Sequence, residues 1–290
     1  MSDVFAAHRG LLFAVAYRIL GSAADAEDAV QDAWLRWSAA DRSAVADPKA
    51  YLVRIVTNVA LDRLRSAAAR RETYIGPWLP EPVHTDVTDD GESVSMALLL
   101  VLENLSPLER AVFVLREAFG FGYAEIADAV QRSEETVRQA AHRARGHVRS
   151  RRPRFPASRE RQRAVTERFF AAAAGGDLNA LMDLLAPDVT LWTDGGGRVR
   201  QAMRPVTGAD RVAAWFGGVA QRSYEGVSPA DMTAEMTELN GSLGLVFRGA
   251  GRVIATVTFD LGADGRITQL YNVANPDKLG AVTAGFPVLR

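Results

Sequence analysis

Apolar residues recur every three or four positions through most of residues 1–150, and this spacing predicts helices. A first helix ends at Gly21, and Ser22, with Asp25 three residues later, marks the start of a second helix. Pro48 stands at the first position of a third helix. The second helix turns an apolar face inward, made of Ala26, Ala29, Val30, Ala33 and Trp37. We therefore predict a compact helical domain over residues 1–68, whose second helix keeps an acidic outer face.

Residues 69–92 interrupt this pattern with glycine, prolines and an acidic run, which predicts an extended, partly disordered linker. Helical spacing returns near Ser93, and Ser106 followed by Pro107 marks a further helix start. Residues 123–130 then predict a helix with Ile126, Ala127 and Val130 on one face. A turn at 131–133 and a second helix, capped by Ser133, complete a helix-turn-helix. Residues 93–152 are thus predicted to form a second all-helical domain.

The hydrophobic period changes after a basic, proline-containing junction at 149–156, and this change predicts a third domain over residues 158–290. Helices are predicted at 160–174, 178–185 and 208–220, with an alternating segment at 188–194. Asn240-Gly241 and Asp264-Gly265 indicate hairpin turns within a four-stranded antiparallel meander, over 232–239, 243–248, 252–260 and 267–274. Helices followed by a curved sheet predict an α+β domain, so the chain as a whole is multidomain.

The second helix of the helix-turn-helix carries a donor-rich face, made of Arg138, Gln139, His142, Arg143 and Arg145. Such a face suits base edges and phosphates in a DNA major groove. The net charge of the chain is only −1, but residues 132–163 hold eleven arginines and three glutamates. The alternative is an ordinary helical hairpin with a solvated basic face.

The amino-acid composition limits the kinds of bond and binding site that we expect in this chain. The chain has no cysteine, and its four histidines are scattered, so we expect no disulfide, no metal site and no cofactor. No apolar run is long enough for a membrane span, and the N-terminus lacks the pattern of a signal peptide. A cytoplasmic protein is expected.

Two strings of residues resemble a known family. DAEDAVQDAW followed by DPKAYLVRIVTNVALDRLR resembles region 2 of the extracytoplasmic-function sigma factors. LSPLERAVFVLREAFGFGYAEIADAVQRSEETVRQAAHRAR resembles their region 4, and the two strings occur in the family's order and spacing. The resemblance implies a subunit that binds core RNA polymerase, recognises minus-10 and minus-35 promoter elements and initiates transcription.

The resemblance also implies roles for individual residues. The polymerase-binding helix is matched by Asp25, Asp28, Gln31, Asp32 and Leu35. The helix and loop that hold the minus-10 element are matched by Arg42, Tyr51, Arg54, Asn58 and Arg63. The helix that reads the minus-35 element is matched by Ser133, Thr136, Arg138, Gln139, His142 and Arg143, with Arg145 and Arg149 at phosphates. Three alternatives stay open: a merely solvated acidic face, a Tyr51 that belongs to the core, and solvated Arg145 and Arg149.

The third domain resembles the SnoaL-like cone fold, which is similar to nuclear transport factor 2, and a subgroup of these sigma factors carries such a fusion. WLPEP, DGGGR and NPDKL look like the linker and tail motifs of that subgroup. The resemblance implies a tail that regulates the sigma regions through intramolecular contact. The residues concerned are Trp78, Leu79 and Pro80, Asp194, Gly195 and Arg198, and Asn275, Pro276 and Asp277. We hypothesise that WLPEP docks near DGGGR or NPDKL; a simple proline spacer is the alternative.

Cone folds often enclose an apolar pocket, so the tail could hold a small-molecule ligand or an enzyme site. Asp188, Trp192 and Asp194 share an alternating face and could point inward beside Trp215 or Asn272. Asp194 before three glycines is more simply a turn or interdomain residue. We expect no enzymatic activity. The alternative function is a helix-turn-helix regulator with a ligand-binding or enzymatic tail.

Overall fold

The computed structural model describes residues 3–41, 43, 45–85, 95–151, 158–220, 223 and 226–284. The described residues divide into two compact units. One unit comprises those up to residue 73 and residues 95–151, and the other comprises residues 74–85 and 158–284. The segment 74–85 therefore packs with the C-terminal part of the chain, although it separates the two helical regions in sequence.

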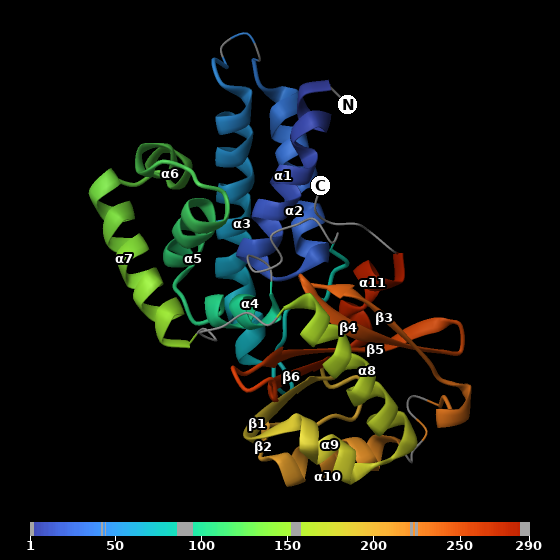
Figure 1. Ribbon diagram of the computed structural model, residues 1–290. Helices are drawn as coiled ribbons and strands as arrows, with labels where there is room; N and C mark the ends of the chain where they lie inside the picture. Colours follow the sequence, from blue (N-terminus) through green and yellow to red (C-terminus); the bar gives the residue numbers. More distant parts are fainter. Residues whose placement is uncertain are drawn as a thin grey trace. The chain divides into compact units, whose positions relative to one another are not determined.

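Three long helices begin the first unit and lie side by side (Figure 1): α1 (Asp3–Leu20), α2 (Ala23–Ala39) and α3 (Pro48–Glu72). Gly21, at φ 70°, follows α1 in the left-handed conformation that glycine adopts without steric cost. Ser22 caps α2, because its Oγ accepts a hydrogen bond from the Asp25 N–H at 3.0 Å. The apolar face predicted for α2 is buried. The helix starts predicted at Ser22 and Pro48 are confirmed.

Four helices form the rest of this unit: α4 (Met96–Leu102), α5 (Pro107–Phe113), α6 (Tyr123–Val130) and α7 (Glu134–Arg151), with a π-helical turn at Val114–Ala118 after α5. Ser106 and Glu109 form a capping box at the start of α5. Gln131 ends α6 in the left-handed conformation, at φ 54°. The inward face of α7 is buried and consists of Val137, Ala140, Ala141, Ala144 and Val148. The predicted helix-turn-helix is confirmed.

The second unit is an α+β domain built on one six-stranded sheet. Its strands are β1 (Leu185–Asp194), β2 (Val206–Thr207), β3 (Thr233–Leu239), β4 (Ser242–Gly249), β5 (Arg252–Leu261) and β6 (Ile267–Val273). Their order is β2-β1-β6-β5-β4-β3. Its helices are α8 (Arg159–Gly175), α9 (Leu178–Leu184), α10 (Ala209–Ala220) and α11 (Gly280–Ala284). Helices α8, α9 and α10 pack on the sheet and share its apolar core (Figure 1).

The antiparallel meander β3–β6 is confirmed, and Asn240 (φ 50°) with Gly241 (φ 69°) makes its first turn. The sheet is nevertheless mixed, because β1 pairs in parallel with β6, from Thr190 beside Gln269 to Asp194 beside Val273. This pairing places the end of β1 next to the end of the last strand. The DGGGR and NPDKL strings, which follow these two strands, are consequently brought together.

Two sequence expectations need correction. The linker was expected from residue 69, but α3 continues to Glu72. Residues 77–83 form no helix or strand, in keeping with an extended linker, and Leu79 and Val83 are fully buried within the second unit. The rest of its acidic run, after residue 85, lies outside the described residues. In α6 the buried residues are Ile126, Ala129 and Val130, whereas Ala127, which was predicted on the same face, is half-buried. Residues 126, 129 and 130 are spaced by three and four positions and therefore share one helical face.

Candidate functional site

The acidic face of α2 is bridged by one arginine of α3. The Arg63 guanidinium lies 2.8 Å from Asp32 Oδ2, 3.2 Å from Asp28 Oδ2 and 3.9 Å from Asp25 Oδ1. The hydrogen bond to Asp32 raises the pKa of Arg63 above its ordinary value. Leu35, with 59% of its surface exposed, is an apolar residue on the same helix. Arg63, expected at the minus-10 element, thus contacts the residues expected at polymerase.

The minus-10 candidates on α3 contact the helix-turn-helix. Asn58 Nδ2 donates to the Ala129 carbonyl at 2.9 Å, and the Arg54 guanidinium lies 3.6 Å from Asp128 Oδ2. Tyr51 is half-buried and packs on Trp37 with ring centroids 5.8 Å apart, and the Arg54 guanidinium stacks over it. Tyr51 is therefore packed on one part of its surface and accessible on another, and its role at the minus-10 element stays a prediction. Arg42 lies outside the described residues.

The exposed face of α7 carries the minus-35 candidates, several of them already paired. The Ser133 hydroxyl caps α7 through Thr136 N–H at 3.2 Å and also lies 2.8 Å from the Thr136 hydroxyl. Arg138 pairs with Glu134 one turn earlier and stacks over the Tyr123 ring. Gln139, His142 and Arg149 are exposed. These exposed groups have access to a base or phosphate without first breaking a tertiary contact.

Two further arginines of α7 hold the helix to its neighbours. Arg143 Nε donates to Glu109 Oε1 at 2.6 Å. Arg145 donates to Glu117 at 2.9 Å and to the Tyr123 hydroxyl at 3.0 Å, and the bond with Tyr123 raises the pKa of Arg145 further above its ordinary value. Arg145 is therefore not simply solvated. A phosphate contact by either side chain would compete with these intramolecular partners.

In the second unit, residues 74–85 form a segment that we call the linker strap, and it binds the end of β1. Asp194 is fully buried. Its carboxylate accepts hydrogen bonds from the Leu79 N–H at 2.8 Å, from the Tyr74 hydroxyl at 2.5 Å and from the Gly196 N–H at 3.1 Å. The carboxylate thus fixes one backbone group of WLPEP to DGGGR.

Lys278 completes this cluster from the NPDKL string. Its ammonium lies 2.7 Å from Asp194 Oδ2 and donates to the Leu79 carbonyl at 2.6 Å. It also lies 4.0 Å from the Trp78 ring centroid and 4.8 Å from that of Tyr74. The three strings WLPEP, DGGGR and NPDKL therefore meet at one buried ion pair.

Other strap contacts involve the glycines and Asn275. Asn275 Nδ2 donates to the Tyr74 hydroxyl at 2.9 Å, and a Cβ at Gly196 would approach this amide to 2.3 Å. Gly195 is equally constrained, because its Cβ would meet the Val199 carbonyl at 2.3 Å. Arg198 and Asp277 form an exposed ion pair at 3.4 Å. Further along, Val83 N–H donates to Asn240 Oδ1 at 3.2 Å.

Sequence reasoning missed Tyr74 and Lys278 as members of this cluster. Burial and the hydrogen bond to Asp194 raise the pKa of Tyr74, so its hydroxyl stays protonated and donates. A signal for Lys278 existed, since it lies inside NPDKL and is one of two lysines in the chain. Nothing in the local pattern marked Tyr74.

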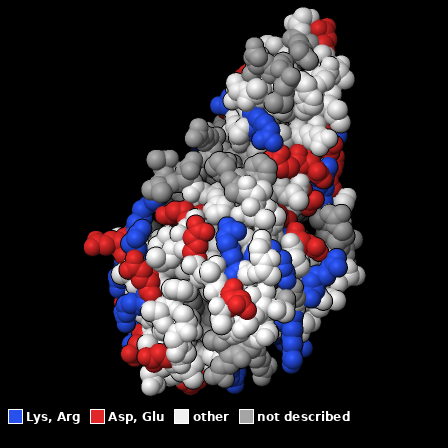
Figure 2. Space-filling model, turned by 90° about the vertical axis from the view of Figure 1, so that its right-hand side faces the viewer, with Lys and Arg blue, Asp and Glu red and all other residues white. Residues whose placement is uncertain are grey.

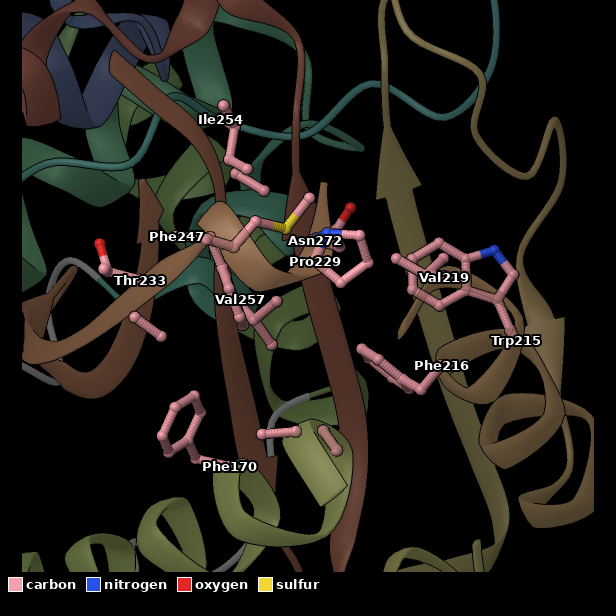
Figure 3. A pocket seen from close by; sticks show the side chains of 15 residues that line it. Phe170, Trp215, Phe216, Val219, Pro229, Thr233, Phe247, Ile254, Val257 and Asn272 are labelled. Atoms are coloured by element: carbon pink, nitrogen blue, oxygen red, sulfur yellow. The ribbon is translucent and has the colours of Figure 1, made fainter. Parts of the chain in front are cut away.

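The tail also holds an apolar pocket of about 210 Å³ between α8, α10 and the sheet (Figure 3). Trp215 and Asn272 line it, as the sequence suggested. Asp194 does not line it and is engaged by the linker strap, and Trp192 instead donates to Gln269 at 2.8 Å. The inward-pointing carboxylate considered for Asp194 is therefore wrong for this pocket.

Figure 2 shows acidic and basic side chains interspersed over the face in view. Within the residues described, no cluster of histidine and carboxylate side chains could hold a metal ion. No helix among them is long and apolar enough to cross a bilayer.

Three family matches agree with this architecture. Residues 4–70 match Sigma-70 region 2, residues 95–148 match Sigma-70 region 4, and residues 166–270 match the SnoaL-like domain. Two helical sigma regions and a SnoaL-like tail define the class of protein.

Two named relatives match this chain over most of its length. The chain is 41% identical to the ECF RNA polymerase sigma factor SigJ of Mycobacterium tuberculosis, over 94% of this chain and 91% of that protein. It is 32% identical to a probable ECF RNA polymerase sigma factor, SigI, of the same organism, over 98% and 96%. The crystal structure of M. tuberculosis SigJ matches with a TM-score of 0.74 at 37% identity, over 98% of both chains.

The chain belongs to the extracytoplasmic-function (ECF) RNA polymerase sigma factors. The resemblance inferred from the sequence motifs is confirmed. Such a protein works with core RNA polymerase and promoter DNA in the initiation of transcription, and this one carries a SnoaL-like tail.

Proposed function

We propose that the tail of this sigma factor regulates promoter-dependent transcription through the linker strap. The observation that supports this proposal best is the buried Asp194–Lys278 ion pair, which binds the N–H and the carbonyl of Leu79. The strap follows α3 and precedes α4 in the chain. Its attachment to the tail therefore shortens the free tether between regions 2 and 4 and limits how far they can separate.

We propose that the exposed residues on the acidic face of α2 bind core polymerase. Asp28, Gln31 and Leu35 offer an exposed acidic and apolar face to core polymerase, beside Asp25 and Asp32. Arg63 holds these acids in place. Its contribution to the minus-10 element would be indirect, because its donors already face three carboxylates.

For promoter DNA we propose two groups of contacts. Exposed Arg138, Gln139 and His142 suit base edges of the minus-35 element, and Arg149 suits a phosphate. Arg143 and Arg145 would exchange a carboxylate partner for a phosphate. For the minus-10 element, Tyr51, Arg54 and Asn58 would first have to leave their contacts with Trp37 and α6.

We also propose that the tail acts by binding and not by catalysis. The Asp194 carboxylate is occupied by the linker strap, and none of the described residues that line the pocket has an ionisable side chain. General acid–base chemistry needs a titratable group within hydrogen-bond reach of the substrate.

The test compares promoter-dependent transcript made by core RNA polymerase with four chains. These are the full chain, Lys278→Met, Arg198→Met and a chain ending at Pro156. Lys278→Met leaves Asp194 buried without its cation, so we expect faster hydrogen exchange at the Leu79 amide and a severalfold change in transcript yield. Arg198→Met is the matched control, since its ion pair is exposed and contributes little. The chain ending at Pro156 gives the sign of regulation.

Each part of the proposal has its own contrary result. Faster exchange at Leu79 with unchanged transcript would contradict regulation through the strap and leave the sigma function intact. Unchanged exchange would contradict the anchoring role of the ion pair. Silence from the native chain, with no polymerase binding, would favour the helix-turn-helix regulator instead.

A further inference from the structure

The tail pocket is lined mostly by apolar side chains, and the aromatic ones come from three elements. Phe170 comes from α8, Trp215 and Phe216 come from α10, and Phe247 comes from β4. Figure 3 shows Phe170 and Trp215 on opposite sides of the space. Since the lining residues that the structure describes include no ionisable group, an ion held among them would lose its hydration without gaining a partner. The pocket therefore favours a neutral, apolar occupant.

One polar group in the pocket has no partner. Asn272 is only 5% exposed, and its Nδ2 donates to the Thr256 carbonyl at 3.5 Å. A carbonyl oxygen can only accept, so the amide nitrogen must face Thr256, and this fixes the orientation of the side chain. Asn272 Oδ1 then accepts no hydrogen bond from any residue the structure describes. A buried acceptor of this kind calls for a donor on whatever fills the pocket.

The volume of the pocket limits the size of the ligand that it can hold. A dry apolar cavity of about 150 Å³ accepts benzene. The pocket here measures about 210 Å³, which suits two fused aromatic rings. Offset or edge-on contacts with the Phe and Trp rings would orient such a ligand.

We propose that this pocket binds a neutral bicyclic aromatic molecule carrying a single hydroxyl or N–H donor, which donates to Asn272 Oδ1. Apolar contacts with the rings supply the affinity. Because Asn272 Oδ1 is an acceptor, the pocket prefers a ligand that carries a hydrogen-bond donor to a ligand of the same shape that lacks the donor.

The experiment titrates the full chain with three probes of similar shape: 2-naphthol, 2-methylnaphthalene and 2-naphthoate. Calorimetry and quenching of tryptophan fluorescence report binding. We expect saturable one-to-one binding of 2-naphthol, about fivefold weaker binding of 2-methylnaphthalene because it cannot donate, and no saturable binding of the 2-naphthoate anion. Equal affinities for 2-naphthol and 2-methylnaphthalene would overturn the role of Asn272.

Two variants locate the binding. Ala234→Phe fills part of the pocket from β3 and should abolish binding of 2-naphthol. Asn272→Leu keeps the volume and removes the acceptor, so the ratio of the two affinities should fall to about one. Both variants are first checked for a cooperative thermal transition. Absent binding of 2-naphthol by the native chain, or binding unaffected by Ala234→Phe, would overturn the site. Because binding is measured without polymerase, these failures would leave the proposed function untouched.

Discussion

At the scale of single residues, the fully buried Asp194 carboxylate requires an explanation. Taking a carboxylate out of water costs several kcal/mol, and only a well-placed cation and further hydrogen bonds offset that cost. Lys278 provides the cation, and Tyr74, Leu79 and Gly196 provide the donors. A buried pair of this kind adds less to net stability than to specificity. Leu79 contacts both members of the pair, because its N–H donates to Asp194 and its carbonyl accepts from Lys278.

A second carboxylate, Asp260 on β5, accepts a hydrogen bond from the Tyr271 hydroxyl. Burial raises the pKa of Asp260 to about 6, although the Tyr271 hydroxyl, donating at 2.8 Å, opposes the shift. The folded state thus favours the protonated carboxyl. The stabilisation is fully present below the unfolded pKa of 3.8 and is lost as pH rises through about 6. We expect it to amount to at most about 3 kcal/mol.

Urea unfolding of the full chain between pH 4 and pH 7 checks this prediction. In Asp260→Asn the free energy of unfolding should no longer fall through this titration as pH rises. Plotted against pH, the free energies of unfolding of the native chain and the variant should converge at low pH and separate toward pH 7. Asp188→Asn, which alters an exposed acid on β1, should follow the native curve. Parallel curves for native and Asp260→Asn would show that Asp260 titrates normally.

At the scale of elements, α7 carries both the groups that we propose contact DNA and the groups that hold the helix in place. Arg145 contacts the Tyr123 hydroxyl and Glu117, whereas Arg149 is exposed. We expect Arg145→Met to destabilise the helix-turn-helix by about 1 kcal/mol and Arg149→Met to leave its stability unchanged. If both arginines contact phosphates, each variant should reduce the slope of log affinity against log salt by about one.

Denaturation of the full chain and binding of its polymerase complex to promoter DNA over a range of salt concentrations separate these effects. An Arg145→Met variant with native stability would contradict the structural role of its contacts. A salt slope unchanged in Arg149→Met would mean that this exposed arginine does not contact a phosphate.

Helix caps could be predicted from the sequence because they are local, whereas contacts between residues far apart in the chain could not. Ser22 and Ser106 accept bonds from residues three positions away, so their helix starts were predictable from local pattern. The partners of Asp194 are not local: Tyr74 is 120 residues away and Lys278 is 84. Their meeting depends on the parallel pairing of β1 with β6, which no turn signal encodes. The motifs predicted that WLPEP lies near DGGGR or NPDKL, but they did not predict that Lys278 joins the three strings.

The same limit applies to Asn58. Its partner on α6 is the backbone carbonyl of Ala129, so no side-chain pattern could reveal the contact. Motif resemblance assigns Asn58 to DNA. The structure shows that α6 holds it in this conformation.

At the scale of the whole molecule, regions 2 and 4 form one unit in which α3 contacts α6. If Arg54 and Asn58 take part at the minus-10 element, this contact must open before they do. The chain has no cysteine, so a pair of introduced cysteines can hold it closed. Lys49 and Phe121 suit this purpose, because the Lys49 ammonium lies 5.5 Å from the Phe121 ring centroid and neither is a candidate for DNA binding.

We expect Lys49→Cys with Phe121→Cys, joined by a short bismaleimide that contains a disulfide, to lose promoter-dependent transcription. Cleavage of the cross-link by reductant should restore it, because the two regions can then separate. The uncross-linked double variant and each single variant treated with the same reagent are the controls. Binding of core polymerase, measured in parallel, distinguishes a chain that cannot engage polymerase from one that engages it and cannot open the promoter. Full transcription from the cross-linked chain would mean that the α3–α6 contact persists in the active complex, and the minus-10 roles of Arg54 and Asn58 would then be wrong.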